Sequence, residues 1–303
     1  MITISPNQDN VTIQTELYCE INEFVKVFHP IFEKHLIGER RQRPFCRLSV
    51  CETMTIPVAY QIIGGLNFKS FYKDVIWQFH RDESPSLVTY QRFAEVATTA
   101  LIPLALFLKF RMEMSDKTGV YVIDSTPLRV CMNQRIPRHK VFKDIAQRGE
   151  SSTGWFYGFK LHMVINHVGQ LMSVHISAGN FDDRKPVLRM VKNLAGKLLG
   201  DKGYIKKALA EVLLKQGLEL ITTVRKNMWQ ALSHFNRFLL RKRAVVETAD
   251  DLLKNHFQIE HSRHRSLAGF MNNVLTGLIA YTYYPDKPEM RGGDLEKALV
   301  IVK

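Results

Sequence analysis

Three acidic residues stand at positions where folding can bring them together for chemistry. Asp124 ends the apolar run Val120–Asp124, Asp201 ends the run Lys197–Asp201, and Glu247 lies in a segment with helical periodicity. Carboxylate oxygens are the ligands that hard cations such as Mg²⁺ prefer. Two such ions stabilise both the attacking and the leaving oxygen when a phosphodiester is displaced. The three acids therefore predict magnesium-dependent chemistry on a phosphodiester backbone, with two Mg²⁺ ions and Mn²⁺ as an accepted substitute.

The two aspartates each have a structural explanation beside the chemical one. Asp124 is followed by Ser125-Thr126-Pro127 and could simply open a turn. Asp201 precedes Lys202-Gly203-Tyr204 and could cap the start of a helix. An acid directly behind an apolar strand is costly to bury without a cation or hydrogen-bond donors, and this favours the chemical reading only when the acids are taken together.

The glutamate is flanked by two cations on one helical face. At about 100° per residue, Arg243 and Lys254 both fall within roughly 40° of Glu247. Such a face fits a metal ligand between cations that hold phosphates, although an ordinary Arg–Glu pair four residues apart is at least as common. Asp251 shares this face and is a decoy acid, whereas Asp250 is expected to point further away.

The composition favours a polyanionic partner. The 303 residues include 42 Lys+Arg and 29 Asp+Glu, a formal net charge of +13. Nucleic acid is the leading candidate, and an anionic membrane surface is the alternative. No apolar run approaches the roughly 18 to 20 residues of a spanning helix, and the N-terminus does not read as a secretory signal. We therefore expect a cytoplasmic protein without membrane partners.

The first third of the chain predicts helices and the remainder predicts a sheet. Residues 1–115 contain four segments with apolar residues at three- and four-residue spacing: Glu16–Phe32, Leu48–Ile63, Phe68–Phe79 and Tyr90–Phe110. We place a domain boundary near Asp116, where the period changes to that of strands.

Residues 116–303 predict a mixed α/β domain with five strands. The expected strands are Val120–Asp124, Tyr157–Asn166, Gln170–Ser177, Lys197–Asp201 and Leu218–Val224. The expected helices are Arg184–Leu194, Ile205–Gln216, one through Glu247, and Leu267–Tyr281. Strands that alternate with helices in this way form a sheet with crossover connections. The helix through Glu247 and the last apolar helix are expected to cover one side of this sheet.

Several short motifs occur in order along the chain: Asp124-Ser-Thr, Gly158-Phe-Lys-Leu-His162, Gly200-Asp-Lys-Gly-Tyr204, Arg243-x-x-x-Glu247 followed by Lys254, and Ile259-Glu-His-Ser-Arg-His-Arg-Ser266. Together they resemble bacterial insertion-sequence transposases of the DDE type, closest to the group named after insertion sequence nine-eighty-two. The resemblance covers about Tyr18 to Tyr284. It implies a ribonuclease-H-like fold with Asp124, Asp201 and Glu247 as catalytic metal ligands. Related families carry a tyrosine three residues before the arginine, but this chain has Leu240 there, so no role of that tyrosine is carried over.

The resemblance also implies an activity and its partners. The enzyme would hydrolyse phosphodiesters at transposon ends and then transfer the freed 3′ hydroxyl into target DNA. Its partners would be terminal inverted repeats and target DNA, bound by a homodimer or higher oligomer, with residues 1–115 serving DNA binding or dimerisation. A metal-dependent nuclease of the same fold and a DNA-binding repressor without catalysis are the alternatives.

Basic residues around the acids are candidates for contacts with the DNA backbone. The candidate DNA-binding side chains are Lys160, Lys202, Arg243, Lys254, Arg263 and Arg265, and Lys140, Lys143 and Arg148 lie in a loop that should edge the site. For any one of them, ordinary solvated surface charge is the alternative.

Overall fold

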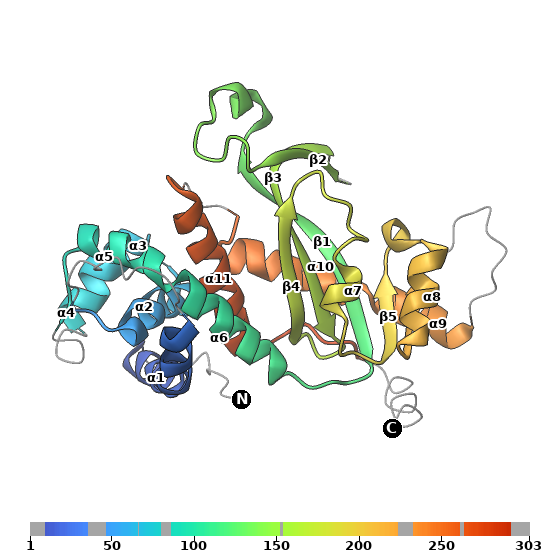
Figure 1. The fold of residues 1–303 in the computed structure, drawn as a ribbon, viewed down its shortest axis with the longest axis horizontal. Helices are drawn as coiled ribbons and strands as arrows, with labels where there is room; N and C mark the ends of the chain where they lie inside the picture. The colour runs from blue at the N-terminus through green and yellow to red at the C-terminus, as the bar shows by residue number, and fades with distance from the viewer. Residues whose placement is uncertain are drawn as a thin grey trace. The chain divides into compact units, whose positions relative to one another are not determined.

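The computed structural model describes residues 10–35, 47–65, 67–79, 86–151, 154–223, 233–260 and 264–291. The chain divides into two compact units, shown in the ribbon of Figure 1. The first unit contains residues 1–111 and 255–285, and the second contains residues 112–254 and 286–303. Each unit is described separately.

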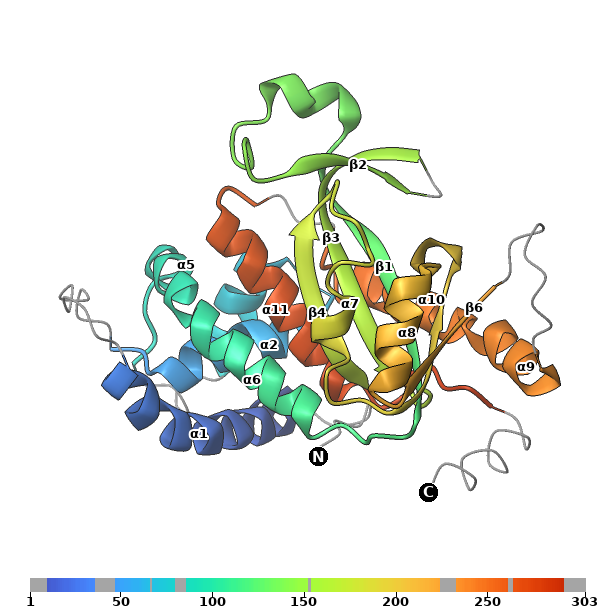
Figure 2. The ribbon, with the colours of Figure 1, turned by 45° about the vertical axis from the view of Figure 1, so that its right-hand side comes forward.

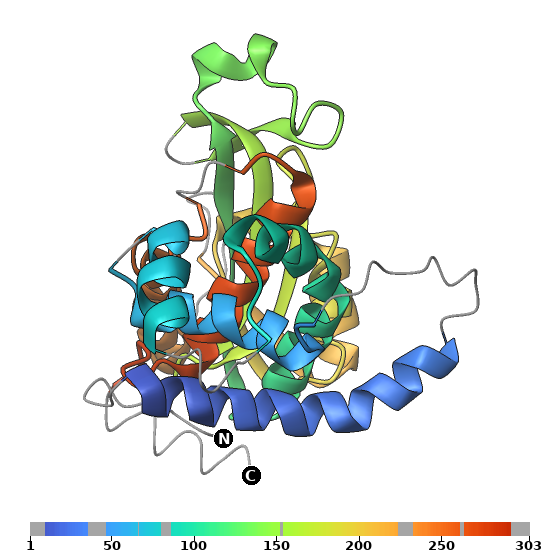
Figure 3. The ribbon, with the colours of Figure 1, turned by 90° about the vertical axis from the view of Figure 1, so that its left-hand side faces the viewer.

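The first unit is helical, as the sequence predicts. Its elements are α1 (Asn10–His35), α2 (Val50–Ile63), α3 (Phe68–Ser70), η1 (Phe71–Ile76), α4 (Trp77–Phe79), α5 (Tyr90–Ala97), η2 (Thr98–Ala100), α6 (Leu101–Glu113) and α11 (Leu267–Tyr283). Ser49 and Glu52 form a capping box at the start of α2, which satisfies backbone groups that a helix end leaves open. Figure 3 shows α1, the dark-blue helix, as a long rod along this unit. Its Phe24 ring packs 5.1 Å from the ring of Phe107 on α6.

Helix α11 groups with the helical unit, although the sequence analysis assigned it to the domain of the sheet. The Gln61 side chain of α2 donates a hydrogen bond to Asn273 of α11 at 2.9 Å, and Asn272 bonds the carbonyl of Ala97. The helix is buried on nearly every face. Because such a helix has no polar side, its periodicity does not indicate which surface it covers. A single domain boundary near Asp116 therefore becomes a division that the chain crosses three times.

The continuous helical segment Tyr90–Glu113 is long and apolar enough to cross a membrane by length and composition alone. Among the described residues it is the one such helix, and the expectation that no apolar run reaches this length is therefore wrong. A third of its apolar window is buried, and Leu104, Phe107 and Leu108 are among the buried residues of the segment. A single such helix is weak evidence for a membrane span, because the core helix of a soluble protein passes the same test.

A buried arginine joins three helices of the first unit. Arg111 is 1% exposed, and its guanidinium forms an ion pair with Glu20 at 2.5 Å. It also donates to the side chain and the carbonyl of Thr282, at 3.1 and 3.2 Å. Its Cζ lies 3.9 Å from the ring centre of Tyr283, whose hydroxyl donates to Glu20 at 3.0 Å. The positive charge of the buried Arg111 is thus compensated by an ion pair, two hydrogen bonds and an aromatic ring, as burial of an ion requires.

The second unit is built on a mixed sheet. Its strands are β1 (Val120–Cys131), β2 (Gln147–Ser151), β3 (Gly154–Asn166), β4 (Leu171–Ala178), β5 (Gly196–Gly200) and β6 (Leu218–Thr222). β1 pairs antiparallel with β3, and β4 and β2 pair antiparallel with the other edge of β3. β1, β5 and β6 run parallel. This arrangement confirms the predicted ribonuclease-H-like fold, with β2 as a strand that the sequence did not indicate.

Helices cover the sheet from both faces. The side chains of Tyr121 and Ile123 enter a core with α7 (Val187–Met190) and α8 (Lys207–Lys215). On the other face α10 (Ala244–Asp251) packs against β1, after α9 (His234–Lys242). Figure 2 shows α7 and α8 in front of the strands and α10 behind them. Helix α7 is much shorter than the expected Arg184–Leu194.

β1 continues well past its predicted end at Asp124 and carries a projecting arm. The arm contains the end of β1, η3 (Asn133–Arg138), a turn region and β2, its two strand segments are paired with the first half of β3, and its tip projects at the top of Figure 1. Beyond Val122, β1 is paired only on the β3 side. Pro127 is tolerated there because a proline at an edge has no ladder hydrogen bond to lose.

We predict that Arg111→Ala lowers the free energy of unfolding by about 3–5 kcal/mol, because it leaves the Glu20 carboxylate unpaired beside a buried tyrosine. Urea titration followed by circular dichroism measures the change. Lys109→Ala, on the exposed side of the same helix, is the matched control and should change stability by no more than about 0.5 kcal/mol. Equal effects of the two variants would contradict a structural role for the buried pair.

Candidate functional site

The pairing register brings the two aspartates to corresponding positions on neighbouring strands. Val122 of β1 is paired with Leu199 of β5. Asp124 and Asp201 each follow two residues later, so both side chains leave the sheet on the same side as that pair. Parallel strands lie about 4.8 Å apart. The prediction that the two acids come from adjacent strands is therefore met by the register.

Asp201 ends β5 and starts a short turn. Its Oδ1 accepts a hydrogen bond from the backbone N–H of Gly203 at 2.8 Å, so the carboxylate caps η4 (Lys202–Tyr204). Gly200, just before it, lies close to Tyr204, because an added Cβ would be 3.1 Å from the ring and the ring would have to shift slightly. Asp201 can therefore serve both roles considered in the sequence analysis, because only one of its two carboxylate oxygens is used for the cap.

Glu247 is tied to Asp124 through one guanidinium. Arg243, at the start of α10, reaches Asp124 Oδ2 from Nη1 at 3.3 Å and Glu247 Oε1 from Nη2 at 2.9 Å. The Asp124 and Arg243 side chains are each 20% exposed, whereas Glu247 is 61% exposed. The arginine therefore bridges an inner and an outer carboxylate.

A fourth acid belongs to this site, and the sequence analysis placed it wrongly. Asp250 Oδ1 is buried and has no hydrogen-bond partner among the described residues. Burial and the nearby Asp124 and Glu247 raise the Asp250 pKa well above its usual value, and Lys254 opposes them. Asp251, the expected decoy, is exposed.

The packing of α10 explains why Asp250 turns inward. Val246, Ala249 and Leu253 are all fully buried, and they follow the spacing of a core-facing helical stripe. Position 250 falls within that stripe, four residues after Val246. An acid inside an apolar stripe is a signal that the sequence already contains, and it would have pointed to Asp250 rather than Asp251.

Burial dominates the electrostatics of Asp124. It raises the Asp124 pKa to about 6, against the Ser125 N–H and Arg243, which lower it. The carboxylates of Asp201 and Glu247 raise it further. The N–H of Ser125 donates to Asp124 Oδ1 at 2.9 Å. The site thus holds more negative charge than its two donors offset.

The chemistry of these side chains fits divalent cations. All four acids offer oxygen, the ligand atom of Mg²⁺ and Ca²⁺, and the Oδ1 of Asp250 is buried without a hydrogen-bond partner among the described residues. Within the described part of the chain, however, no three His, Cys, Asp or Glu side chains lie close enough together to hold a metal ion. The Arg243 guanidinium occupies the place between Asp124 and Glu247. A cation bridging those two carboxylates would have to displace it.

The predicted DNA-binding residues fall into different settings. Lys160 is turned inward, with its Nζ 2.9 Å from Asp183 Oδ1. Lys202 is exposed beside Asp201, and Lys254 is half-buried beside Asp250. Arg265 is exposed but belongs to the first unit, and Arg263 lies outside the described residues.

The projecting arm adds basic surface to the second unit. Between Arg129 and Ser151 the arm has six Lys or Arg residues and two acids. All six of these cations are exposed: Arg129, Arg135, Arg138, Lys140, Lys143 and Arg148. Beneath them Phe142 is buried, with its ring 5.8 Å from that of Phe159 on β3, so the arm has its own small core.

Comparison with known proteins gives a family and several solved chains, one of which is described here. A family model described as "Transposase DDE domain" matches residues 114–267, just over half of the chain. A cryo-EM structure of a piggyBac transposase synaptic complex with hairpin DNA is similar, with a TM-score of 0.45 and 11% identity, over 97% of this chain and 80% of that chain. That likeness is too weak to support conclusions about fold or function. No curated protein matches the chain.

We predict that Asp124→Asn stabilises the metal-free protein in a pH-dependent way. The folded-state pKa of about 6 lies above the ordinary value of 3.8, so ionisation opposes folding as the pH rises through this interval. At pH 7.5 the variant should gain up to about 3 kcal/mol in the free energy of unfolding, and at pH 4 less than about 1 kcal/mol. Urea titrations in EDTA measure both, with the exposed Asp251→Asn as control. A difference between wild type and Asp124→Asn that is the same at both pH values would contradict the assignment.

Proposed function

The chain belongs to the transposase DDE domain family, and from that premise we propose that Asp124, Asp201 and Glu247 hold the divalent cations with which it cuts and joins DNA. The observation that carries this proposal is the β1–β5 register, which sets the two aspartates side by side, with Arg243 linking Asp124 to Glu247. Mg²⁺ is the expected ion, and Mn²⁺ is the expected substitute. When bound, the cations would activate water and offset the charge of the reacting phosphate.

The chain's own residues prepare the site for that charge. The carboxylate of Asp124, which is largely buried, has two donors, and the Asp250 Oδ1 has none among the described residues. Arg243 offsets part of the negative charge in the metal-free protein, at the position between Asp124 and Glu247. On this proposal the guanidinium moves away from those carboxylates when cations bind. It then becomes available to a phosphate, for which its planar fork is well suited.

The reaction we propose has two steps at one site. Hydrolysis at a transposon end frees a 3′ hydroxyl, and this hydroxyl then attacks target DNA. Neither step needs a covalent bond to the protein, so Ser125 is not proposed as a nucleophile. Its backbone N–H donates a hydrogen bond to Asp124.

DNA would approach along the basic surfaces of the second unit. The arm's exposed cations, together with Lys202, supply contacts that do not depend on base sequence. Lys160 is the exception among the predicted contacts, because Asp183 already holds its ammonium group. The helical unit, with Arg265, would bind terminal inverted repeats or pair two protomers, because two ends must be cut together.

The narrower identity is part of the same proposal. The motifs support a bacterial insertion-sequence transposase of the nine-eighty-two group, and DNA as substrate supports a cytoplasmic location. The alternative functions are a nuclease of the same fold, which would cleave DNA without joining it, and a repressor without catalysis, which would bind DNA without cleaving it.

We predict that Asp124→Asn, Asp201→Asn and Glu247→Gln each lower DNA cleavage by at least about 100-fold, because each removes a proposed cation ligand. Binding of the same DNA, measured by gel shift in EDTA, should change less than about threefold. Asp251→Asn, four residues after Glu247, is the matched control and should keep its activity. Cleavage that survives in Asp124→Asn would overturn the proposed site, and DNA binding without any cleavage by the wild type would favour the repressor.

The same assay separates the transposase from the nuclease. A pre-cut terminal end carrying a free 3′ hydroxyl is supplied with Mg²⁺ and a supercoiled target plasmid. A transposase gives target molecules covalently joined to the labelled end. Hydrolysis of the uncut end without any joined product would identify the nuclease instead.

A further inference from the structure

Asp250 is the acid of the candidate site that lacks a partner. Asp124 and Glu247 both accept hydrogen bonds from Arg243. Asp201 accepts one from the backbone of the turn that follows it. Asp250 forms no salt bridge within the described part of the chain, and its buried Oδ1 has no hydrogen-bond donor there. A buried polar atom of this kind calls for an explanation, such as a bound ion.

The packing of α10 does not require an acid at position 250. The neighbouring side chains on the same stripe of the helix, Val246, Ala249 and Leu253, are apolar and fully buried. A carboxyl beside them costs free energy unless it is hydrogen-bonded or paired with a cation. The fold therefore bears a cost in the metal-free protein that a bound cation would offset.

Asp250 lies on the side of α10 that faces β1 and Asp124. Helix α10 packs against β1, and position 250 lies roughly 40° around the helix from the buried Val246. Burial, Asp124 and Glu247 raise the Asp250 pKa well above its usual value, although Lys254 lowers it. Because such charge effects fall with distance, the Asp250 carboxyl is a close neighbour of the Asp124 carboxylate. The residue as a whole is half-buried, so its carboxyl is not sealed within the core.

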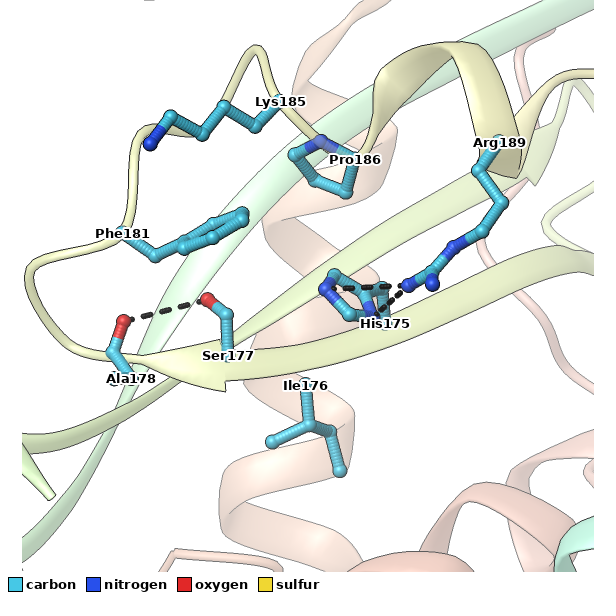
Figure 4. Close-up of a pocket in the computed structure, with 8 residues that line it drawn as sticks. All are labelled: His175, Ile176, Ser177, Ala178, Phe181, Lys185, Pro186 and Arg189. Atoms are coloured by element: carbon cyan, nitrogen blue, oxygen red, sulfur yellow. Dashed lines mark hydrogen bonds between the residues drawn. The ribbon is translucent and has the colours of Figure 1, made fainter. Parts of the chain in front are cut away.

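The hollow on the other face of the sheet contributes no carboxylate. It lies between the end of β4 and the loop before α7, has a volume of about 490 Å³, and has no acidic side chain in the lining shown in Figure 4. Its His175 pairs with His162, which pairs with Ser125, the residue next to Asp124. Paired side chains share one face of a sheet and consecutive ones alternate, so the hollow and the Asp124 carboxylate lie on opposite faces. The further acid beside Asp124 thus comes from α10.

We propose that Asp250 is a fourth carboxylate ligand, and that it binds one divalent cation together with Asp124. Mg²⁺ is usually held by only one or two carboxylates, while water and substrate phosphates complete its shell. Two acids therefore suffice, and a group of three metal-binding side chains, which the described residues do not contain, is not needed. The assignment rests on the proposed function, because it takes Asp124 as a ligand of the reacting cations.

The test measures binding of Mn²⁺ to the full chain, from the loss of the electron paramagnetic resonance signal of the free ion. Asp250→Asn keeps the shape of the side chain and removes its charge, and it should weaken binding about 10- to 100-fold, as Asp124→Asn should. Asp251→Asn changes the adjacent exposed acid and is the control, with an affinity within about twofold of the wild type. The titration is repeated with duplex DNA of mixed sequence, after subtraction of the ions that the DNA alone binds.

Thermal unfolding separates a ligand from a structural residue. In EDTA, Asp250→Asn should unfold at the temperature of the wild type or above it, because the Oδ1 of Asp250 has no hydrogen bond to lose among the described residues. The same concentration of Mn²⁺ should raise the unfolding temperature of the wild type more than that of the variant. A variant that is less stable in EDTA, or that gains as much from Mn²⁺ as the wild type does, contradicts the assignment.

The outcomes separate this proposal from the proposed function. Mn²⁺ affinity that falls in Asp124→Asn but not in Asp250→Asn overturns the fourth ligand, even if the protein cuts and joins DNA. If both variants bind Mn²⁺ weakly and the wild type fails to cut DNA, the fourth ligand is supported and the transposase is not. A wild type that binds no Mn²⁺, with or without DNA, overturns both.

Discussion

The balance of charge around one largely buried carboxylate, that of Asp124, determines the electrostatics of the candidate site. Raising its pKa to about 6 corresponds to roughly 3 kcal/mol that the fold must supply when the group is ionised. Arg243 supplies part of this, but only because α10 presents its first turn to β1. The apolar stripe Val246, Ala249 and Leu253 fixes that placement. Core packing on one side of the helix thus determines electrostatics on its rim.

The site could be read from the sequence where local pattern and chemistry coincide. Asp124 and Asp201 were found because each follows an apolar run, and the shared register then brings them together. Arg243 and Glu247 were found from their four-residue spacing, and the ion pair is present. Asp250 was missed because angular distance from Glu247 was used without asking which face of the helix is buried. The ion pair of Lys160 with Asp183 was not foreseen, because the sequence does not show which acid lies beside this lysine, and its contact with DNA stays a prediction.

The fold could be predicted for the helices and strands whose apolar residues recur at a regular spacing. The four N-terminal helices and five strands follow from spacing of apolar residues. The end of β1 did not, because Pro127 normally marks the end of a strand and is accommodated here only at an unpaired edge. The partner of α11 did not either, because a helix buried all round carries no directional signal. The end of β1 and the packing partner of α11 both depend on residues far apart in the sequence, and a pattern read over a short segment does not show such pairing.

The continuity of β1 has a consequence for how such a protein can diversify. Asp124 lies in the interior of a strand whose backbone is paired with β3 from Tyr121 to Cys131, and the arm is the far end of that same strand. The acid is therefore anchored by a ladder that does not depend on what the arm's tip contains. Insertions or exchanges within residues 132–146 would alter the basic outer surface while the interior of the sheet keeps its geometry. The catalytic acid and the basic surface are thus carried by the same strand, β1, but the sequence of the arm can change without moving the acid.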